Sequence, residues 1–196
     1  MKHTKADIVS KGEFLARSKG YYDTSLNDIL EECGISKGTF YNYFESKEDY
    51  LNQVLESYGL GMNDYMNVVL KDSSKSPIAR LEQLYYSLVE MNEKEKCENG
   101  CLLINFSEEV GGSIDSISNR CSLIFNGWLE RVADCIQEGQ EKDEIIKDMN
   151  ALDLARFIHT SVNGTCAIMK IERSTAPMKQ MIDTCLSLIT TKSKTN

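Results

Sequence analysis

The start and stop signals for helices in the first quarter of the chain constrain its fold more than any other feature. Thr24 or Ser25 can cap a helix, because a hydroxyl oxygen at that position accepts a hydrogen bond from a free backbone N–H group. Ser36 and Ser46 can cap the next two helices in the same way. Gly34 lies where a left-handed residue would end the first of them. This spacing predicts two short helices joined by a tight turn and followed by a third.

Helical patterns also dominate the rest of the sequence. Apolar residues recur at intervals of three and four, and there is no sustained alternation of apolar and polar residues of the kind that indicates strands. Pro77 and Pro177 favour the first turn of two helices, where the missing N–H group costs little. We therefore predict an all-α fold with helices at about 4–19, 37–43, 77–94, 100–110, 114–140, 150–172 and 176–191.

The charge distribution supports a division into two domains. We expect a three-helix N-terminal domain over 1–47 and a helical bundle over 48–196, with the helix that starts at 46 linking them and a polar loop at 71–76. The net charge is −8, but residues 1–47 contain as many basic as acidic residues, so the surplus acid lies in 48–196. A neutral domain can still bind phosphates through local lysines, hydroxyls and backbone N–H groups.

Composition and motifs disfavour several classes of protein. No segment approaches 18 consecutive apolar residues, and no apolar stretch follows the N-terminus, so we expect no membrane span, no secretory signal and a cytoplasmic location. The seven cysteines form no CxxC pair, and neither histidine is placed to complete a metal site. We find no phosphate-binding loop, nucleophile elbow or acid–base pair. We therefore expect no cofactor, no metal and no enzymatic activity.

The segment 37–43 has the properties of a helix that reads DNA. Phe40 and Phe44 have the spacing to pack inward, which leaves the polar residues beside them with few duties in the core. A helix of this size fits the major groove. Gly38 lets the backbone approach closely, and Lys47 adds a positive charge beside free backbone N–H groups that favour a phosphate.

The residues from Thr24 to Glu48 carry a resemblance to a known family. They are similar to the pattern T-S-x-x-D-I-x-x-x-x-G-[VI]-S-K-G-T-F-Y-x-Y-F-x-S-K-E of the TetR family of bacterial regulators. The resemblance implies a DNA-binding transcriptional regulator, a repressor that covers a palindromic operator on double-stranded DNA as a homodimer. An all-α enzyme or interaction module with an incidental helix-turn-helix is the alternative class.

The same resemblance implies which residues contact DNA. Tyr43 and Lys47 would bind phosphates. The residues nearest the bases would be Thr39, Tyr41 and Asn42. With the residues that flank the helix starts, the candidate DNA-binding set is Thr24, Ser25, Ser36, Lys37, Gly38, Thr39, Tyr41, Asn42, Tyr43 and Lys47.

A second stretch, 99–109, resembles one branch of the family. It is similar to the segment G-C-L-x-x-N-x-x-x-E of a branch that includes NemR-like and YxaF-like repressors, some of which sense electrophiles or oxidants. The sequence departs from that branch at Ile104 and Phe106, where Gly and Leu are frequent. Cys101 occupies the position of the motif cysteine.

The signal that releases the regulator has two readings. In the first, an unidentified small-molecule inducer binds in the second domain, with Cys101, Asn105, Phe125, Trp128 and Met169 as candidate contacts. In the second, Cys101 is a thiol switch, because a helix N-terminus beside Gly100 would favour its thiolate. Cys101 and the three large apolar candidates, Phe125, Trp128 and Met169, also have a plain alternative as packing residues. Cys97 is either a resolving thiol or an inert surface cysteine.

The last two helices are the expected dimer interface, as they are in the TetR family. They carry more apolar residues than one small bundle needs. The expected interface residues are Leu154, Phe157, Ile158, Val162, Cys166, Met169, Met181, Ile182, Cys185, Leu186 and Ile189.

Overall fold

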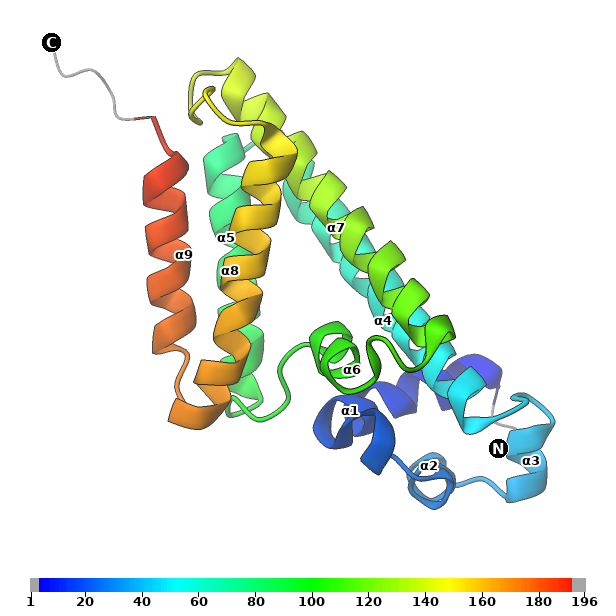
Figure 1. Ribbon diagram of the computed structural model, residues 1–196. Helices are drawn as coiled ribbons and strands as arrows, with labels where there is room; N and C mark the ends of the chain where they lie inside the picture. Colours follow the sequence, from blue (N-terminus) through cyan, green and yellow to red (C-terminus); the bar gives the residue numbers. More distant parts are fainter. Residues whose placement is uncertain (1–3, 192–196) are drawn as a thin grey trace, which may run out of the picture. The chain divides into compact units, whose positions relative to one another are not determined.

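The computed structural model describes residues 4–191, and within that range its regular secondary structure is helical, apart from one isolated bridge between Ile145 and Thr190. The expected all-α fold is confirmed, and apart from the end of the first helix the expected helix ends lie within about two residues of the observed ones. Lys2, one of the basic residues of 1–47, and His3, one of the two histidines, lie outside the described residues. The helices are α1 (Lys5–Asp23), α2 (Leu26–Cys33), α3 (Lys37–Tyr41), α4 (Lys47–Leu70), α5 (Pro77–Lys94), α6 (Leu102–Val110), α7 (Asp115–Glu141), α8 (Ala151–Glu172) and α9 (Ala176–Ile189) (Figure 1).

Helix α1 extends further than expected because it contains a break. Gly20 has φ 83° and ψ −173°, a conformation that residues with a side chain rarely adopt. The chain then makes one more turn before Thr24. Gly20 therefore marks an interruption of α1 just after the expected helix end at 19, and not the end of α1.

Capping interactions fix the starts of the next three helices, as the sequence predicts. Ser25 and Asp28 form a capping box, in which each side chain accepts a hydrogen bond from the other's backbone N–H group. The hydroxyls of Ser36 and Ser46 each accept from the N–H group three residues on. Gly34 ends α2 in the left-handed conformation with φ 65°.

An aromatic cluster fixes α3 against α4. The ring centroid of Phe40 lies 5.1 Å from that of Phe44 and 5.6 Å from that of Tyr50, and all three side chains are buried. The Tyr50 hydroxyl donates to the Ile8 carbonyl of α1 over 3.1 Å. A single cluster thus connects three helices.

The chain forms two compact units that do not follow the expected division after residue 47. The first unit holds residues up to Met62 together with Asn99–Phe125, and the second holds Asn63–Glu98 together with residues from Asn126 onward. The difference arises because α6 packs on α1, and because α4 and α7 each contribute to both units.

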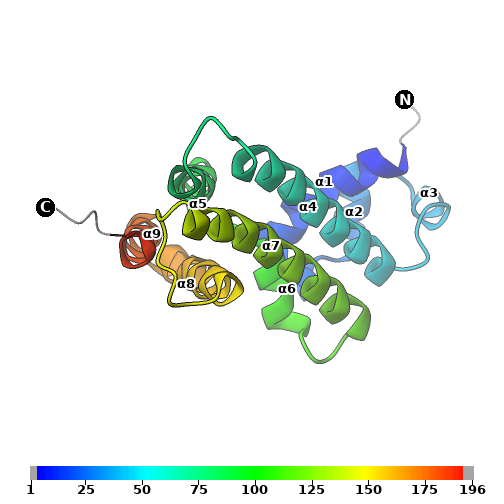
Figure 2. The same cartoon turned by 90° about the horizontal axis from the view of Figure 1, so that it is seen from above.

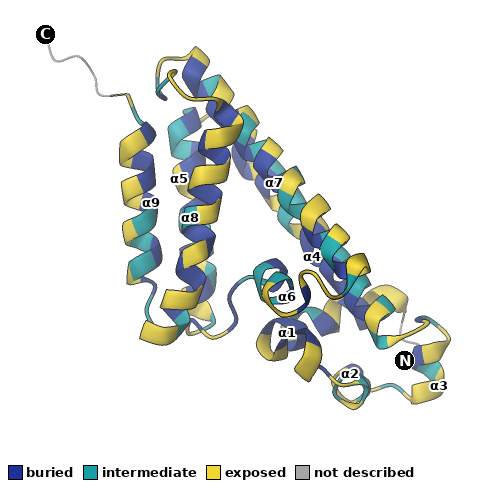
Figure 3. Ribbon diagram, in the orientation of Figure 1, coloured by how far each residue is buried: buried dark blue, intermediate teal, exposed yellow. Residues whose placement is uncertain are grey.

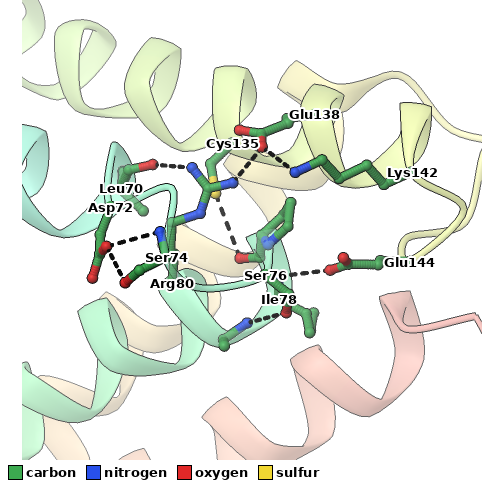
Figure 4. A network of polar contacts seen from close by, with 12 residues as sticks. Leu70, Asp72, Ser74, Ser76, Ile78, Arg80, Cys135, Glu138, Lys142 and Glu144 are labelled. Atoms are coloured by element: carbon green, nitrogen blue, oxygen red, sulfur yellow. Dashed lines mark hydrogen bonds and ion pairs between the residues drawn. The ribbon is translucent and has the colours of Figure 1, made fainter.

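A buried arginine organises one end of the second unit. The Arg80 guanidinium donates to the Leu70 carbonyl at the end of α4 and pairs with Glu138 of α7, each over 2.6 Å (Figure 4). The Cys135 thiol donates to the Pro77 carbonyl at the start of α5. Three helices and the loop between α4 and α5 are joined at this point.

The interior of the second unit contains a buried histidine among aromatic rings. Helix α9 packs on α8 and α5 (Figure 2). On α8, the His159 ring is 5% exposed and lies 6.1 Å from the Tyr85 ring and 6.0 Å from the Trp128 ring. Burial lowers the pKa of His159 to about 4, because the charged imidazolium is poorly solvated there.

We predict that His159 makes stability depend on pH between about 6.5 and 4. In this window the unfolded chain binds a proton that the folded chain does not, so the free energy of unfolding falls as the pH falls, by about 1.4 kcal/mol per pH unit for one proton. His159→Phe removes this proton while keeping an aromatic ring. Urea denaturation followed by circular dichroism should therefore give a flatter pH dependence for the variant, and parallel curves for the two proteins would contradict the prediction.

Candidate functional site

Helix α3 presents a polar face opposite its buried aromatic residue. Phe40 faces the core, whereas Lys37, Gly38 and Asn42 are exposed and the Tyr41 side chain is 50% exposed. Thr39 and Tyr43 are half-buried beside them. These exposed groups offer an ammonium, an amide and a phenol within 37–42, which is a set suited to phosphates and base edges.

The caps that flank this face have restricted side chains. The Ser36 hydroxyl accepts from the Thr39 backbone N–H over 3.1 Å and lies 2.9 Å from the Thr39 hydroxyl. Ser25 is exposed, and its hydroxyl is bound to the carboxylate of Asp28. Hydrogen bonds from Lys19 and Ser25 hold the pKa of the Asp28 carboxyl well below its usual range. The two serines therefore stabilise helix starts first, and any contact with DNA would be additional.

Thr24 does not fit the expected role in DNA binding. Its side chain is fully buried, and its hydroxyl donates to the Gly20 carbonyl at the break in α1. The pair Thr24–Ser25 offered two candidates for one cap, and only Ser25 fills it. Burial leaves Thr24 no surface for a phosphate.

Lys47 has partners within the chain that the sequence did not indicate. Its ammonium donates to the carbonyl oxygens of Tyr21 and Tyr22 over 3.1 and 3.4 Å, and it lies 5.1 Å from the centroid of the Tyr21 ring. Its charge remains at the edge of the three-helix DNA-binding part of the chain, α1–α3, which we call the reader. Two of its three N–H groups are engaged by these carbonyls.

Cys101 differs from the other cysteines in exposure and position. It is half-exposed, whereas the other six cysteines are buried. It is the N-cap residue of α6 without a side-chain cap bond, and the Tyr58 hydroxyl donates to its sulfur over 3.5 Å. Cys97 is not the surface cysteine of our expectation, because it is buried, and burial raises the pKa of its thiol.

The first unit contains an apolar cleft between α6 and the first half of α7. Its volume is about 420 Å³, and of the candidate ligand contacts Phe125 lies in its wall. The lining consists of the uncharged residues Leu103, Ile104, Phe106, Ser107, Val110, Gly111, Gly112, Ile117, Ser118, Cys121, Ser122 and Phe125.

The other candidate ligand residues occupy different surroundings. Trp128 and Met169 are buried in the second unit, at 2% and 0% exposure. The Asn105 amide donates to the carbonyls of Arg17 and Asn99 over 3.2 and 2.9 Å. The sequence could suggest these residues from their polarity and helical spacing. It did not indicate whether they line the same cavity.

Most of the expected dimer contacts are buried within the chain itself, which leaves them little surface for a partner. Phe157 is 45% exposed and Met181 is half-buried, whereas the other nine residues of the expected set are buried: Leu154, Ile158, Val162, Cys166, Met169, Ile182, Cys185, Leu186 and Ile189. These residues face inward where α8 and α9 pack on each other and α9 packs on α5. Exposed stretches alternate with buried ones along α8 and α9 (Figure 3). The large apolar side chains that these two helices expose are Leu152, Phe157, Ile168, Ile171 and Leu188.

Two absences hold for residues 4–191. No helix in this range is long and apolar enough to cross a membrane. Within the same range, no group of three or more His, Cys, Asp or Glu side chains is placed to hold a metal ion.

Comparison with known proteins gives consistent matches along the chain. Residues 77–185 match the family described as Tetracyclin repressor-like, C-terminal domain, and residues 8–54 match Bacterial regulatory proteins, tetR family. The chain is 33% identical over 175 residues to the HTH-type transcriptional repressor DhaR of Mycobacterium sp. strain GP1, covering 89% of this chain and 86% of that protein.

Solved structures share the fold over nearly the whole chain. The crystal structure of a regulatory protein TetR from Rhodobacter sphaeroides matches with a TM-score of 0.89 and 24% identity, over 94% of this chain and 97% of that one. The reduced form of NemR from Escherichia coli matches with a TM-score of 0.89 and 21% identity, over 96% and 98% of the two chains.

Proposed function

The chain belongs to the TetR family of bacterial regulatory proteins, and from this premise we propose that it is a homodimeric repressor released from a palindromic operator by a small, uncharged, apolar inducer. As a member of this family it is a DNA-binding transcriptional regulator. DhaR, its relative over most of the chain, is named a transcriptional repressor. In this proposal the protein acts in the cytoplasm, where operator DNA is accessible.

The polar face of α3 carries the DNA-binding part of the proposal. Because Phe40 anchors the helix, Lys37, Tyr41 and Asn42 are held outward and need no rearrangement to meet a groove. We assign Lys37 to a phosphate, since it is an exposed ammonium in the first turn of α3. Asn42 is the residue best suited to an adenine edge, because its amide offers both a donor and an acceptor.

We predict that Lys37→Ala weakens DNA binding mainly by removing one phosphate contact. The slope of log affinity against log salt concentration should become shallower by about 1, and the loss should be similar on specific and random duplexes. Fluorescence anisotropy with a duplex selected by the wild-type chain from a randomised pool measures this. Lys147→Ala, at an exposed lysine of the second unit, is the control. An unchanged slope for Lys37→Ala would refute the assigned contact.

The exposed apolar residues of α8 and α9 carry the dimer part of the proposal. Phe157, Ile168 and Leu188 are 45%, 44% and 60% exposed, and Ile171 is 78% exposed. Large apolar side chains gathered on two adjacent helices indicate a surface that another protein covers. A second copy is the occupant we propose, since one short reader contacts too little DNA to be selective and a palindrome requires two.

We predict that Phe157→Glu shifts the chain from dimer to monomer. A carboxylate buried there without a partner would cost several kcal/mol, which is enough to disrupt a moderate interface. Analytical ultracentrifugation measures the change. Leu123→Glu is the matched control, because Leu123 is an exposed apolar residue of α7. If Phe157→Glu stays dimeric at micromolar concentration, the interface lies elsewhere.

The cleft between α6 and α7 carries the inducer part of the proposal. Its volume of about 420 Å³ is in the range of small-molecule sites, and its uncharged lining disfavours an ionised ligand. Serine hydroxyls of the wall already have partners within the chain, since Ser107 donates to the Leu103 carbonyl and Ser118 donates to the Val110 carbonyl. A neutral, largely apolar molecule fits this wall best.

A second candidate signal is covalent and is favoured by Cys101. This residue combines exposure with a place at the start of α6, where the helix dipole favours an anion. The structural likeness to NemR shows that the two chains share a fold.

We predict that Cys101 reacts faster with a limiting alkylating agent than the other cysteines do. Burial raises the pKa of the thiols of Cys33, Cys121, Cys135 and Cys185, which lowers their thiolate fraction. Mass spectrometry of the native protein identifies the labelled site, and anisotropy shows whether alkylation releases DNA. If Cys101→Ser still releases DNA on alkylation, the thiol switch is excluded and the reversible inducer remains.

A further inference from the structure

The segment Gly100–Glu109 contains polar residues whose purpose neither an inducer nor a thiol switch explains. We propose that Glu109, supported by Asn105, is a positioning residue for DNA recognition, which holds the end of α1 and thereby sets the place of the helices that follow it. This inference rests on the proposed function, because it concerns how the reader is held in its DNA-binding arrangement.

Glu109 accepts two adjacent backbone hydrogen bonds from α1. Its Oε2 atom accepts from the N–H groups of Tyr21 and Tyr22 over 2.9 and 3.0 Å. These N–H groups are available because Gly20 interrupts the helix with φ 83°. A side chain at position 20 would overlap the Glu109 carboxylate, so the space that glycine leaves is occupied by this contact.

The same two residues are held through their carbonyl groups by a cation. Lys47 of α4 donates to the carbonyl oxygens of Tyr21 and Tyr22. One turn of α1 is therefore bound on both sides: an anion from α6 accepts from its N–H groups, and a cation from α4 donates to its C=O groups. Hydrogen bonds to ionised partners are stronger than those between neutral groups.

One turn earlier in α1, further hydrogen bonds join it to α6 and to the residue before α6. Asn105, four residues before Glu109, donates to the Arg17 carbonyl over 3.2 Å. In the opposite direction the buried Arg17 guanidinium donates to the Gly100 carbonyl over 3.1 and 2.8 Å. The spacing of four residues puts Asn105 and Glu109 on one face of α6. That face is matched to α1 over two successive turns.

Glu109 differs from the buried contacts in that it remains exposed to solvent. Because the carboxylate stays in contact with water whether bound or released, it can leave the two N–H groups without a large change in its own solvation. The contact is therefore suited to holding an arrangement that can also be released. It lies on the helix whose residues Ser107 and Val110 line the cleft, so movement of α6 would act directly on α1.

The end of α1 leads directly into the reader. Thr24 follows the held turn and donates to the Gly20 carbonyl, and Ser25 then caps α2. A change at Tyr21 and Tyr22 therefore reaches α2 without an intervening flexible loop.

The test compares Glu109→Ala with Glu108→Ala, a change at the exposed neighbouring residue on the same helix. The probe is a duplex selected by the wild-type chain from a randomised pool, with a scrambled duplex beside it. We expect Glu109→Ala to weaken binding to the selected duplex at least tenfold while changing binding to the scrambled duplex less than threefold. Glu109→Gln, which keeps one carbonyl acceptor, should fall between Glu109→Ala and the wild type.

Thermal unfolding and amide hydrogen exchange separate positioning from simple stabilisation. Faster exchange at the Tyr21 and Tyr22 amides, with the weaker selective binding, supports the proposal. Selective binding by folded Glu109→Ala that equals that of Glu108→Ala overturns it, even if the unfolding temperature is lower. If Glu109→Ala does not fold, the same comparison is made with Glu109→Gln, which overturns the proposal if it binds and exchanges as the wild type does. A wild-type chain that selects no duplex refutes the proposed function itself.

Discussion

The packing of Phe40 against Phe44 and Tyr50 is the interaction on which the DNA-binding part of the molecule depends. A helix of five residues is too short to be stable alone, because helix nucleation is unfavourable and few hydrogen bonds follow it. Burial of the Phe40 ring supplies the stabilisation that the few backbone hydrogen bonds of α3 do not provide. The same ring decides which face of α3 turns to solvent, so the identity of the exposed residues is a consequence of the core. Tyr50 carries the constraint onward to α1 through the Ile8 carbonyl.

The features that the sequence predicted well are those with local causes. Ser25, Ser36 and Gly34 act on backbone groups within four residues, so their effect can be read from spacing alone. The polar face of α3 was also predictable, because its neighbours Phe40 and Phe44 are too apolar to remain outside. The assignment of that face to DNA came from the family resemblance as well as from the residues.

The features that the sequence did not predict depend on contacts distant in sequence. Nothing near Lys47 indicates that it binds the carbonyls of residues 26 and 25 positions earlier. On α8, Ile158 and Phe157 are equally apolar neighbours, and only the packing of α9 and α5 decides that one is buried and the other exposed. For Thr24, the break at Gly20 turns a plausible surface hydroxyl into an internal one. A single sequence does not show which of these side chains is buried or which distant group it binds.

The place of the single tryptophan has a practical consequence for how this protein is observed. Trp128 lies in the second unit beside His159, and the first unit contains tyrosines but no other indole. Intrinsic tryptophan emission therefore reports on the second unit, and loss of structure confined to the reader would leave the indole signal unchanged. Agreement between emission and far-ultraviolet circular dichroism is thus a direct measure of cooperativity between the units, because the dichroism records helices in both. A dichroism transition that precedes the emission transition would reveal a state in which the second unit is folded and the first is not.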